Sequence, residues 1–210
     1  FLDLSGNDII GTIPKEIGHL TELTEIRLYD NKISGTIPRE LGKLSELLYL
    51  FLFNNELGGT IPRELGKFEQ LQFMNLSGNK LGGTIPPGLG KLAELQQMNL
   101  SYNKLMGVIP RGLRKLSALS TLDLSFNELN ETIPSDLGPL RGLTWISLNN
   151  NKLRGTVPSE MVQLISLEYM DLSFNKLRGT IPIEFRKLKV LKYIALNNNK
   201  FGGTIPTELA

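Results

Sequence analysis

Two carboxylates occupy equivalent positions in chain segments that closely repeat each other, because Asp123 and Asp171 are separated by two units of 24 residues. On stacked parallel strands, that step would place the two side chains about 10 Å apart. Such a separation suits the acid and base of an inverting glycoside hydrolase. The sequence predicts neither a third polar group nor a deep pocket beside them, so we predict no catalytic residues and no enzymatic activity.

Other residue types that support catalysis or metal binding are scarce. His19 is the only histidine, and the chain contains no cysteine. One imidazole without neighbouring ligands provides neither a catalytic triad nor a metal site. We therefore predict no metal ion and no cofactor, and a disulfide framework is excluded.

Aromatic side chains recur at one position of the 24-residue unit and are the strongest candidates for a binding surface. The aromatic residues of this column are Phe1, Tyr49, Phe73, Trp145, Tyr169 and Tyr193, and Tyr29, Phe51 and Phe53 lie two or four positions further along their units. Exposed aromatic patches usually mark interaction surfaces. We predict that they contact a protein or carbohydrate partner, with Arg27, Asp123 and Asp171 nearby. The alternative is that aromatic residues simply favour strands and stack along the sheet.

Three sequons for N-glycosylation begin at Asn75, Asn99 and Asn130. Each could carry a glycan if the protein is secreted. Asn130 is the best placed, since it belongs to a predicted loop. A glycan on Asn75 or Asn99 would lie close to Phe73 and would conflict with a flush protein contact there.

Threonine forms another regular column, which could match an ordered lattice such as ice. Its members are Thr12, Thr36, Thr60, Thr84, Thr132, Thr156, Thr180 and Thr204, and Val108 interrupts them. A single file of threonines gives a narrow surface, and threonine also favours strands. Ice binding is therefore a minor alternative.

These columns exist because one asparagine recurs every 24 residues without deviation. It is found at Asn7, Asn31, Asn55, Asn79, Asn103, Asn127, Asn151, Asn175 and Asn199. A unit repeated in register is the sequence signature of a solenoid, in which each unit packs only on its neighbours. A carboxamide both donates and accepts hydrogen bonds, so we predict that these asparagines form a buried structural ladder and bind no ligand.

The unit beginning near residue 20 shows which elements position the columns. Residues 26–29 alternate apolar and polar side chains, as in a strand with one buried face. Residues 35–38, Gly-Thr-Ile-Pro, predict a second extended segment, because the glycine permits a tight turn and the proline ends a ladder. In residues 39–44, leucines three positions apart predict a short 3₁₀ or irregular turn.

The consensus L-x-x-L-x-x-L-x-L-S-x-N-x-L-x-G-T-I-P-x-x-L-G resembles the plant-type extracellular leucine-rich repeat over essentially the whole chain. The resemblance implies an α/β solenoid, which is a right-handed superhelix with a parallel β-sheet on its concave face. A second short sheet at the G-T-I-P segments and 3₁₀ or irregular helical turns on the convex face are also implied. We expect residues 1–210 to form one domain of about nine 24-residue repeats.

The net charge and the two ends of the chain indicate which classes of partner to expect. The 23 basic and 21 acidic residues give a net charge of +2, which is too small and too evenly spread to indicate a nucleic-acid or anionic-membrane partner. No stretch reaches the roughly 18 apolar residues of a membrane span. Both ends fall inside repeats without the polar caps that solenoids need. We expect either a piece of a longer chain or end-to-end or lateral self-association.

The sequence therefore predicts a non-catalytic recognition module, extracellular or at the cell surface, that presents its concave face to a protein or glycan. The resemblance implies receptor ectodomains and inhibitors of wall-degrading enzymes as the nearest analogues. A rival prediction, based on the missing caps and uniform repeats, is a structural or self-assembling component of a cell coat, matrix or filament.

Overall fold

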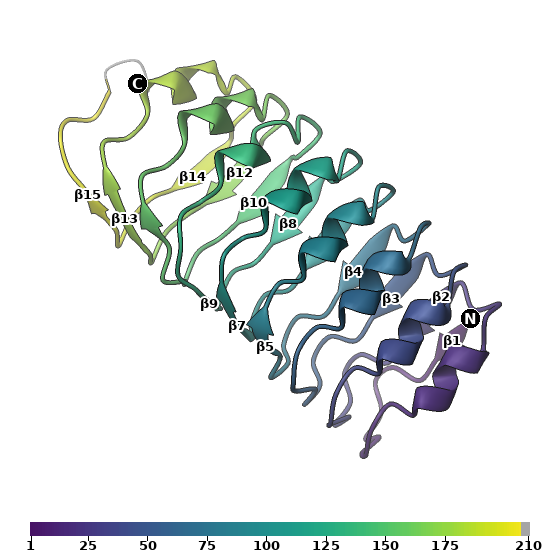
Figure 1. The fold of residues 1–210 in the computed structure, drawn as a ribbon. Coiled ribbons are helices and arrows are strands. Elements are labelled where there is room, and N and C mark those ends of the chain that lie inside the picture. The colour runs from purple at the N-terminus through teal and green to yellow at the C-terminus, as the bar shows by residue number, and fades with distance from the viewer. Residues whose placement is uncertain (207–210) are drawn as a thin grey trace.

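A computed structural model describes residues 1–206, and in it each 24-residue unit forms one coil of a continuous curved stack (Figure 1). Each coil begins with a short strand, and from the second coil to the eighth the central residue of that strand is buried, as Ile26 and Leu50 are. These strands pair in parallel in chain order, with a register shift of one unit, so that Leu50 lies opposite Met74. The nine-stranded sheet comprises β1 (Leu2–Asp3), β2 (Glu25–Arg27), β3 (Tyr49–Phe51), β4 (Phe73–Asn75), β6 (Gln97–Asn99), β8 (Thr121–Asp123), β10 (Trp145–Ser147), β12 (Tyr169–Asp171) and β14 (Tyr193–Ala195).

Additional short strands form two three-stranded parallel sheets. The first contains β5 (Gly82–Thr84), β7 (Lys104–Gly107) and β9 (Glu128–Leu129), and the second contains β11 (Arg154–Gly155), β13 (Lys176–Gly179) and β15 (Lys200–Phe201). The prediction of a second sheet is confirmed, but all six strands begin before the Gly-Thr-Ile-Pro segment or its equivalent, and only β7, β11 and β13 end at its glycine. The glycine at this position in β7, Gly107, has a φ of +79°, which turns the backbone out of the extended ladder.

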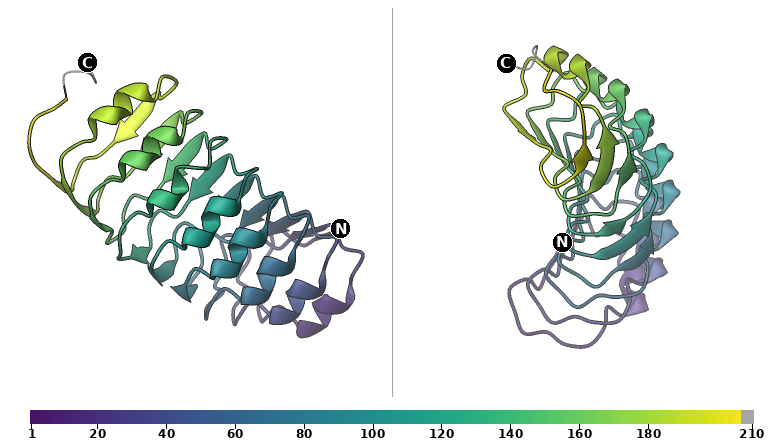
Figure 2. Two further views of the ribbon diagram at one scale, coloured as in Figure 1. Left: turned by 45° about the horizontal axis from the view of Figure 1, so that its top comes forward. Right: turned by 90° about the vertical axis from the view of Figure 1, so that its left-hand side faces the viewer.

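The helical turns are all 3₁₀ within residues 1–206, which confirms the prediction of short 3₁₀ turns on the convex face. Each turn begins after a proline and runs along the convex side of the curve (Figure 2). The turns are η1 (Lys15–His19), η2 (Arg39–Lys43), η3 (Arg63–Lys67), η4 (Pro87–Lys91), η5 (Arg111–Lys115), η6 (Ser135–Leu137), η7 (Ser159–Gln163) and η8 (Ile183–Lys187). None of these helices is long or apolar enough to span a bilayer.

The core is one unbroken column of inward-facing leucine, isoleucine, methionine and phenylalanine side chains. The asparagine of each coil lies at the edge of this column, where the strand ends. From the second coil onward, its Oδ1 accepts a hydrogen bond from a backbone N–H of the preceding coil, as Asn55 does from Ile33 at 3.0 Å. Its Nδ2 donates to a carbonyl of the preceding coil, that of Leu28 for Asn55, at 2.9 Å. The ladder therefore links successive coils where the strands stop.

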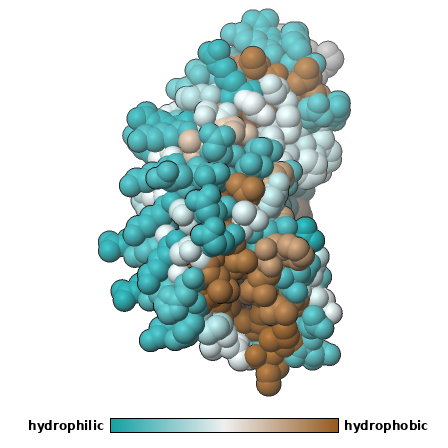
Figure 3. Space-filling model, turned by 90° about the vertical axis from the view of Figure 1, so that its right-hand side faces the viewer, coloured by the Kyte–Doolittle hydropathy of each residue, from teal (hydrophilic) through white to brown (hydrophobic). Residues whose placement is uncertain are grey.

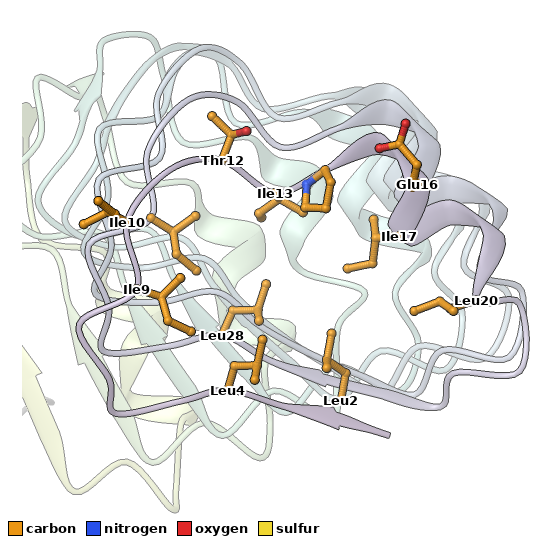
Figure 4. A pocket seen from close by; sticks show the side chains of 12 residues that line it. Leu2, Leu4, Ile9, Ile10, Thr12, Ile13, Glu16, Ile17, Leu20 and Leu28 are labelled. Atoms are coloured by element: carbon orange, nitrogen blue, oxygen red, sulfur yellow. The ribbon is translucent and has the colours of Figure 1, made fainter.

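The interior of the first coil forms an apolar hollow of about 400 Å³. Its inward side chains, including Leu2, Ile9 and Ile17, belong to the columns that later coils bury (Figure 4). Apolar residues gather at this end of the molecule (Figure 3), where Phe1 is 82% and Ile10 77% exposed. The hollow is thus the continuation of the core and is not a separately built pocket.

Candidate binding surface

The N-terminal aromatic cluster consists of Tyr29, Tyr49, Phe51, Phe53 and Phe73, which project from adjacent coils of the nine-stranded sheet. Tyr29 and Phe53 stack with centroids 4.4 Å apart and an interplanar angle of 6°. Tyr49 contacts Phe73 at 5.3 Å and Phe51 at 6.2 Å. All five side chains are half-buried. The register of strands β2–β4 therefore brings these predicted contact residues together.

The C-terminal aromatic stack consists of Trp145, Tyr169 and Tyr193. Trp145 and Tyr169 are 3.5 Å apart at 3°, and Tyr169 and Tyr193 are 4.4 Å apart at 3°. Burial, followed by the negative charge of Asp171, raises the pKa of Tyr169 to about 12. Three coils separate this stack from Phe73, so the predicted aromatic surface consists of two groups.

Apart from the pair Tyr49 and Phe51, the rings of both groups stack along the direction in which the coils stack, so most ring faces are covered and the edges are directed to the surface. The two end rings of the C-terminal stack, Trp145 and Tyr193, each stack on one aromatic ring only. The geometry matters chemically because a ring face is electron-rich and attracts cations, whereas an edge carries partial positive charge. Tyr193, which is 46% exposed, adds a hydroxyl group to the C-terminal stack.

The predicted charged residues of this face are already engaged within the protein. Arg27 forms ion pairs with Glu25 at 2.6 Å and with Asp3 at 3.6 Å, and the pKa of its guanidinium is raised chiefly by the bond to Glu25. Oδ1 of Asp123 accepts hydrogen bonds from the backbone and the hydroxyl of Ser125. Asp171, which is 7% exposed, is bonded in the same way by Ser173. These bonds hold each carboxylate in one orientation at the end of its strand.

The sequons differ in their surroundings. Asn75 and Asn99 lie opposite each other on β4 and β6, and each accepts hydrogen bonds from the serine of its own sequon. Asn130 is exposed on the flank of the stack, and Thr132 of its sequon lies beside it at the surface. The threonine column runs along the same flank, at the turns of the Gly-Thr-Ile-Pro segments. His19 lies on the surface of the convex side.

Sequence reasoning missed a second set of aromatic residues, Tyr102, Phe126 and Phe174. They directly precede ladder asparagines and have φ angles of +50° to +52°, in a column otherwise occupied by glycine, aspartate and asparagine. Tyr102 and Phe126 stack at 4.1 Å, and Tyr102 is 57% exposed. A bulky residue at a left-handed position is uncommon, and this departure from the column was the available signal.

Comparisons with known proteins agree with this architecture. A family model described as "Leucine rich repeat" matches residues 21–81, 83–129 and 134–201, and a second leucine-rich repeat model matches residues 1–20. Comparison with curated protein sequences gave no significant match.

Similar solved structures include two ectodomains of Arabidopsis receptor kinases. The leucine-rich repeat ectodomain of GASSHO1/SCHENGEN3, in complex with CASPARIAN STRIP INTEGRITY FACTOR 2, is 38% identical with a TM-score of 0.98, over 99% of this chain and 25% of that chain. HAESA, in complex with the peptide hormone IDA and the co-receptor SERK1, is 36% identical with a TM-score of 0.92, over 98% of this chain and 35% of that chain. This chain thus spans about a third or less of these relatives.

A plant ice-binding protein is also similar. It is 26% identical with a TM-score of 0.76, and the match covers 98% of this chain and 74% of that chain.

Proposed function

Because the chain belongs to the leucine-rich repeat family, of the plant extracellular type, we propose that it is a non-catalytic extracellular recognition module. Its concave sheet binds an extended segment of a protein partner. The observation that carries this proposal is the pair of aromatic groups on one sheet, whose half-exposed rings offer apolar area at low conformational cost.

The stacking of the rings favours a protein segment over a glycan. A sugar ring packs its C–H groups on the face of an aromatic ring, and in both groups most faces are covered by another ring. Edges and hydroxyls instead suit the carbonyl oxygens and apolar side chains of a polypeptide. Two of the similar structures are those of HAESA with the peptide hormone IDA and of the plant peptide hormone receptor RGFR1 with RGF2, which supports a peptide as the partner here.

Panning of a random peptide library against the whole chain tests the proposal. Enriched peptides should lose affinity by about tenfold or more in the F51S/F53S variant, because two apolar anchors are removed. The control is I165S, which removes an exposed apolar residue on the convex side and should leave affinity unchanged. Equal binding by wild type and F51S/F53S, or enrichment only of glycans on an array, would overturn the assignment. Ordered polymers in electron micrographs would instead favour a self-assembling structural component.

Ice binding is a second candidate, favoured by the threonine column and by the similarity to a plant ice-binding protein. A β-carbon built on Gly155 would lie 2.8 Å from Cγ2 of Thr132, so each threonine methyl packs over the glycine of the next coil in a fixed orientation. The regular surface is only one residue wide, because the residues two positions before the column differ between coils. Gly82, Met106 and Arg154 are examples. Measurable thermal hysteresis that disappears in T84K/T156K would support this function, and its absence in the wild type removes it.

A further inference from the structure

Trp145 has one covered and one uncovered face. Its ring is parallel to that of Tyr169 on β12, with centroids 3.5 Å apart, so the covered face points along the stack toward the C-terminus. The opposite face is therefore directed at Thr121, its register partner on β8.

Thr121 is too small to cover that indole face. It is the shortest side chain in a column that otherwise carries aromatic rings, glutamate or glutamine. Trp145 remains 40% exposed although Tyr169 covers one of its faces. The space above Thr121 is thus bounded on one side by an open, electron-rich aromatic surface.

A carboxylate lies beside the same space. Asp123 is two residues beyond Thr121 on β8, so the two side chains project from the same face of the sheet. Ser125 donates both of its hydrogen bonds to Oδ1, and Oδ2 has no hydrogen bond or ion pair among residues 1–206. The side chains that face this space from β6 and β10, Gln97, Asn99 and Ser147, are uncharged.

The charge of this region is negative beyond Asp123 itself. Asp171 projects from the same face two strands away, and no basic residue occurs in β6, β8, β10 or β12. Burial is the main cause of the raised pKa of Tyr169, and the negative charges of Asp171 and Asp123 add to it.

An indole face and an oriented carboxylate together match a planar cation. A guanidinium group stacks flat on an indole and donates hydrogen bonds in its plane to a carboxylate. We propose that the site above Thr121, between the open face of Trp145 and Oδ2 of Asp123, binds an arginine side chain of the partner. This inference rests on the proposed function, because the arginine belongs to the protein segment that the concave sheet binds.

The spacing adds a requirement on that segment. Tyr49 and Thr121 lie three coils apart, which is about 14 Å at the usual strand spacing. About four residues of extended chain span that length. The partner should therefore carry an aromatic or aliphatic residue for the N-terminal aromatic cluster and an arginine roughly four positions away.

Trp145 is the only tryptophan, so its fluorescence reports directly on the site. The probes are the capped tripeptide Gly-Arg-Gly and its uncharged analogue with citrulline in place of arginine, titrated into the whole chain at low salt. The arginine peptide should change the emission saturably, and the citrulline peptide should not. The D123N variant should weaken binding by about three- to tenfold, since an exposed ion pair is lost. T121Y should abolish the response by covering the indole face.

Both variants should keep the local structure, because other coils carry the introduced residues at the equivalent positions. Asparagine occupies the position of Asp123 in the two preceding coils, where Asn75 and Asn99 accept the same serine bonds. Tyrosine occupies the position of Thr121 at Tyr49 and Tyr193. D8N, on the flank, is the charge-matched control and should bind like the wild type.

An equal response to citrulline, or unchanged affinity in D123N, would overturn the arginine site. If library peptides still bind through Phe51 and Phe53 in that case, the proposed function survives without it. If those peptides also fail to bind, the proposed function is overturned as well.

Discussion

Oδ1 of Asn127 accepts a hydrogen bond of 2.9 Å from the backbone N–H of Leu105, which lies 22 residues earlier in the preceding coil. Nδ2 of the same side chain donates to the carbonyls of Leu100, Leu124 and Ser125 at 2.9 to 3.2 Å. Asn127 is 8% exposed, so water cannot readily replace these partners. One carboxamide therefore satisfies four backbone groups at the point where two strands end.

Replacing Asn127 by alanine should destabilise the fold strongly. The N–H of Leu105 and the three carbonyls would lose a partner in a mostly buried setting, at a cost of about 2 to 4 kcal/mol in the free energy of unfolding. Asn7 provides the control, because it is exposed and its Nδ2 donates only within its own coil. N7A should cost less than about 1 kcal/mol. Urea denaturation measures both, and similar losses would contradict the cross-coil role of the ladder.

Gly155 should not tolerate a side chain. Its φ is +80°, and an added β-carbon would approach Cγ2 of Thr132 to 2.8 Å. G155A should lower stability by about 1 to 3 kcal/mol through strain and overlap. In the double variant G155A/T132S the overlapping methyl is absent, so part of the loss should be recovered.

The control for Gly155 is Gly11, which has a φ of +90° but no atom within 4 Å of the position that a β-carbon would take. G11A should therefore lose stability only through the strain of alanine at a positive φ, and this loss should be smaller than that of G155A. Thermal unfolding of the wild type and the three variants separates the two contributions. An equal effect of G11A and G155A would mean that the contact with Thr132 is unimportant.

The phenol of Tyr169 should ionise at a higher pH than those of the other tyrosines. Its pKa is about 12, against an ordinary value of about 10, so the native state favours the protonated phenol. The corresponding stabilisation is complete below pH 10 and is lost as pH rises from about 10 to 12. A pH titration followed by the ultraviolet absorbance of tyrosinate should show one component that titrates at a higher pH than the rest, and the Y169F variant should lack it. If the component that titrates at the higher pH persists in Y169F, the high pKa belongs to another residue.

Asn130 should be the glycosylated sequon when the protein is secreted by a eukaryotic cell. It is exposed on the flank, whereas Asn75 and Asn99 lie opposite each other on the concave sheet about 4.8 Å apart, too close for two glycans. Mass spectrometry should find the glycan at Asn130 and not at both other sites. The T132A variant, which destroys the sequon, should lose it, and an unmodified Asn130 would refute the prediction.

Much of the fold could be predicted because every 24-residue unit places its apolar residues at the same positions. Residues such as Ile26 and Leu50 alternate with polar neighbours, and their recurrence every 24 residues requires equivalent coils stacked in register. The bounds of the short strands near the Gly-Thr-Ile-Pro segment were harder to predict, because strand pairing there depends on where Gly107 and its equivalents turn the chain. The 3₁₀ turns followed from leucines three residues apart.

The candidate surface was only partly predictable. The column containing Tyr49, Trp145 and Tyr169 was visible in the sequence, since strand periodicity assigns it to the outer face of the sheet. The orientation of the rings was not, because a rotamer depends on the side chain in the next coil. Tyr102 and Phe126 were missed for a related reason: their left-handed backbone and mutual stacking appear only when consecutive turns are superimposed.

By itself, then, the sequence determined the stack, its concave sheet and the positions of its columns, because a strict period leaves one way to bury each apolar residue. The tertiary structure alone decided which groups remain available to a partner. Stacking covers one face of Trp145 and leaves the other open above Thr121, and Ser125 occupies one oxygen of Asp123 but not the other. These differences arise from contacts between coils, which no single repeat encodes.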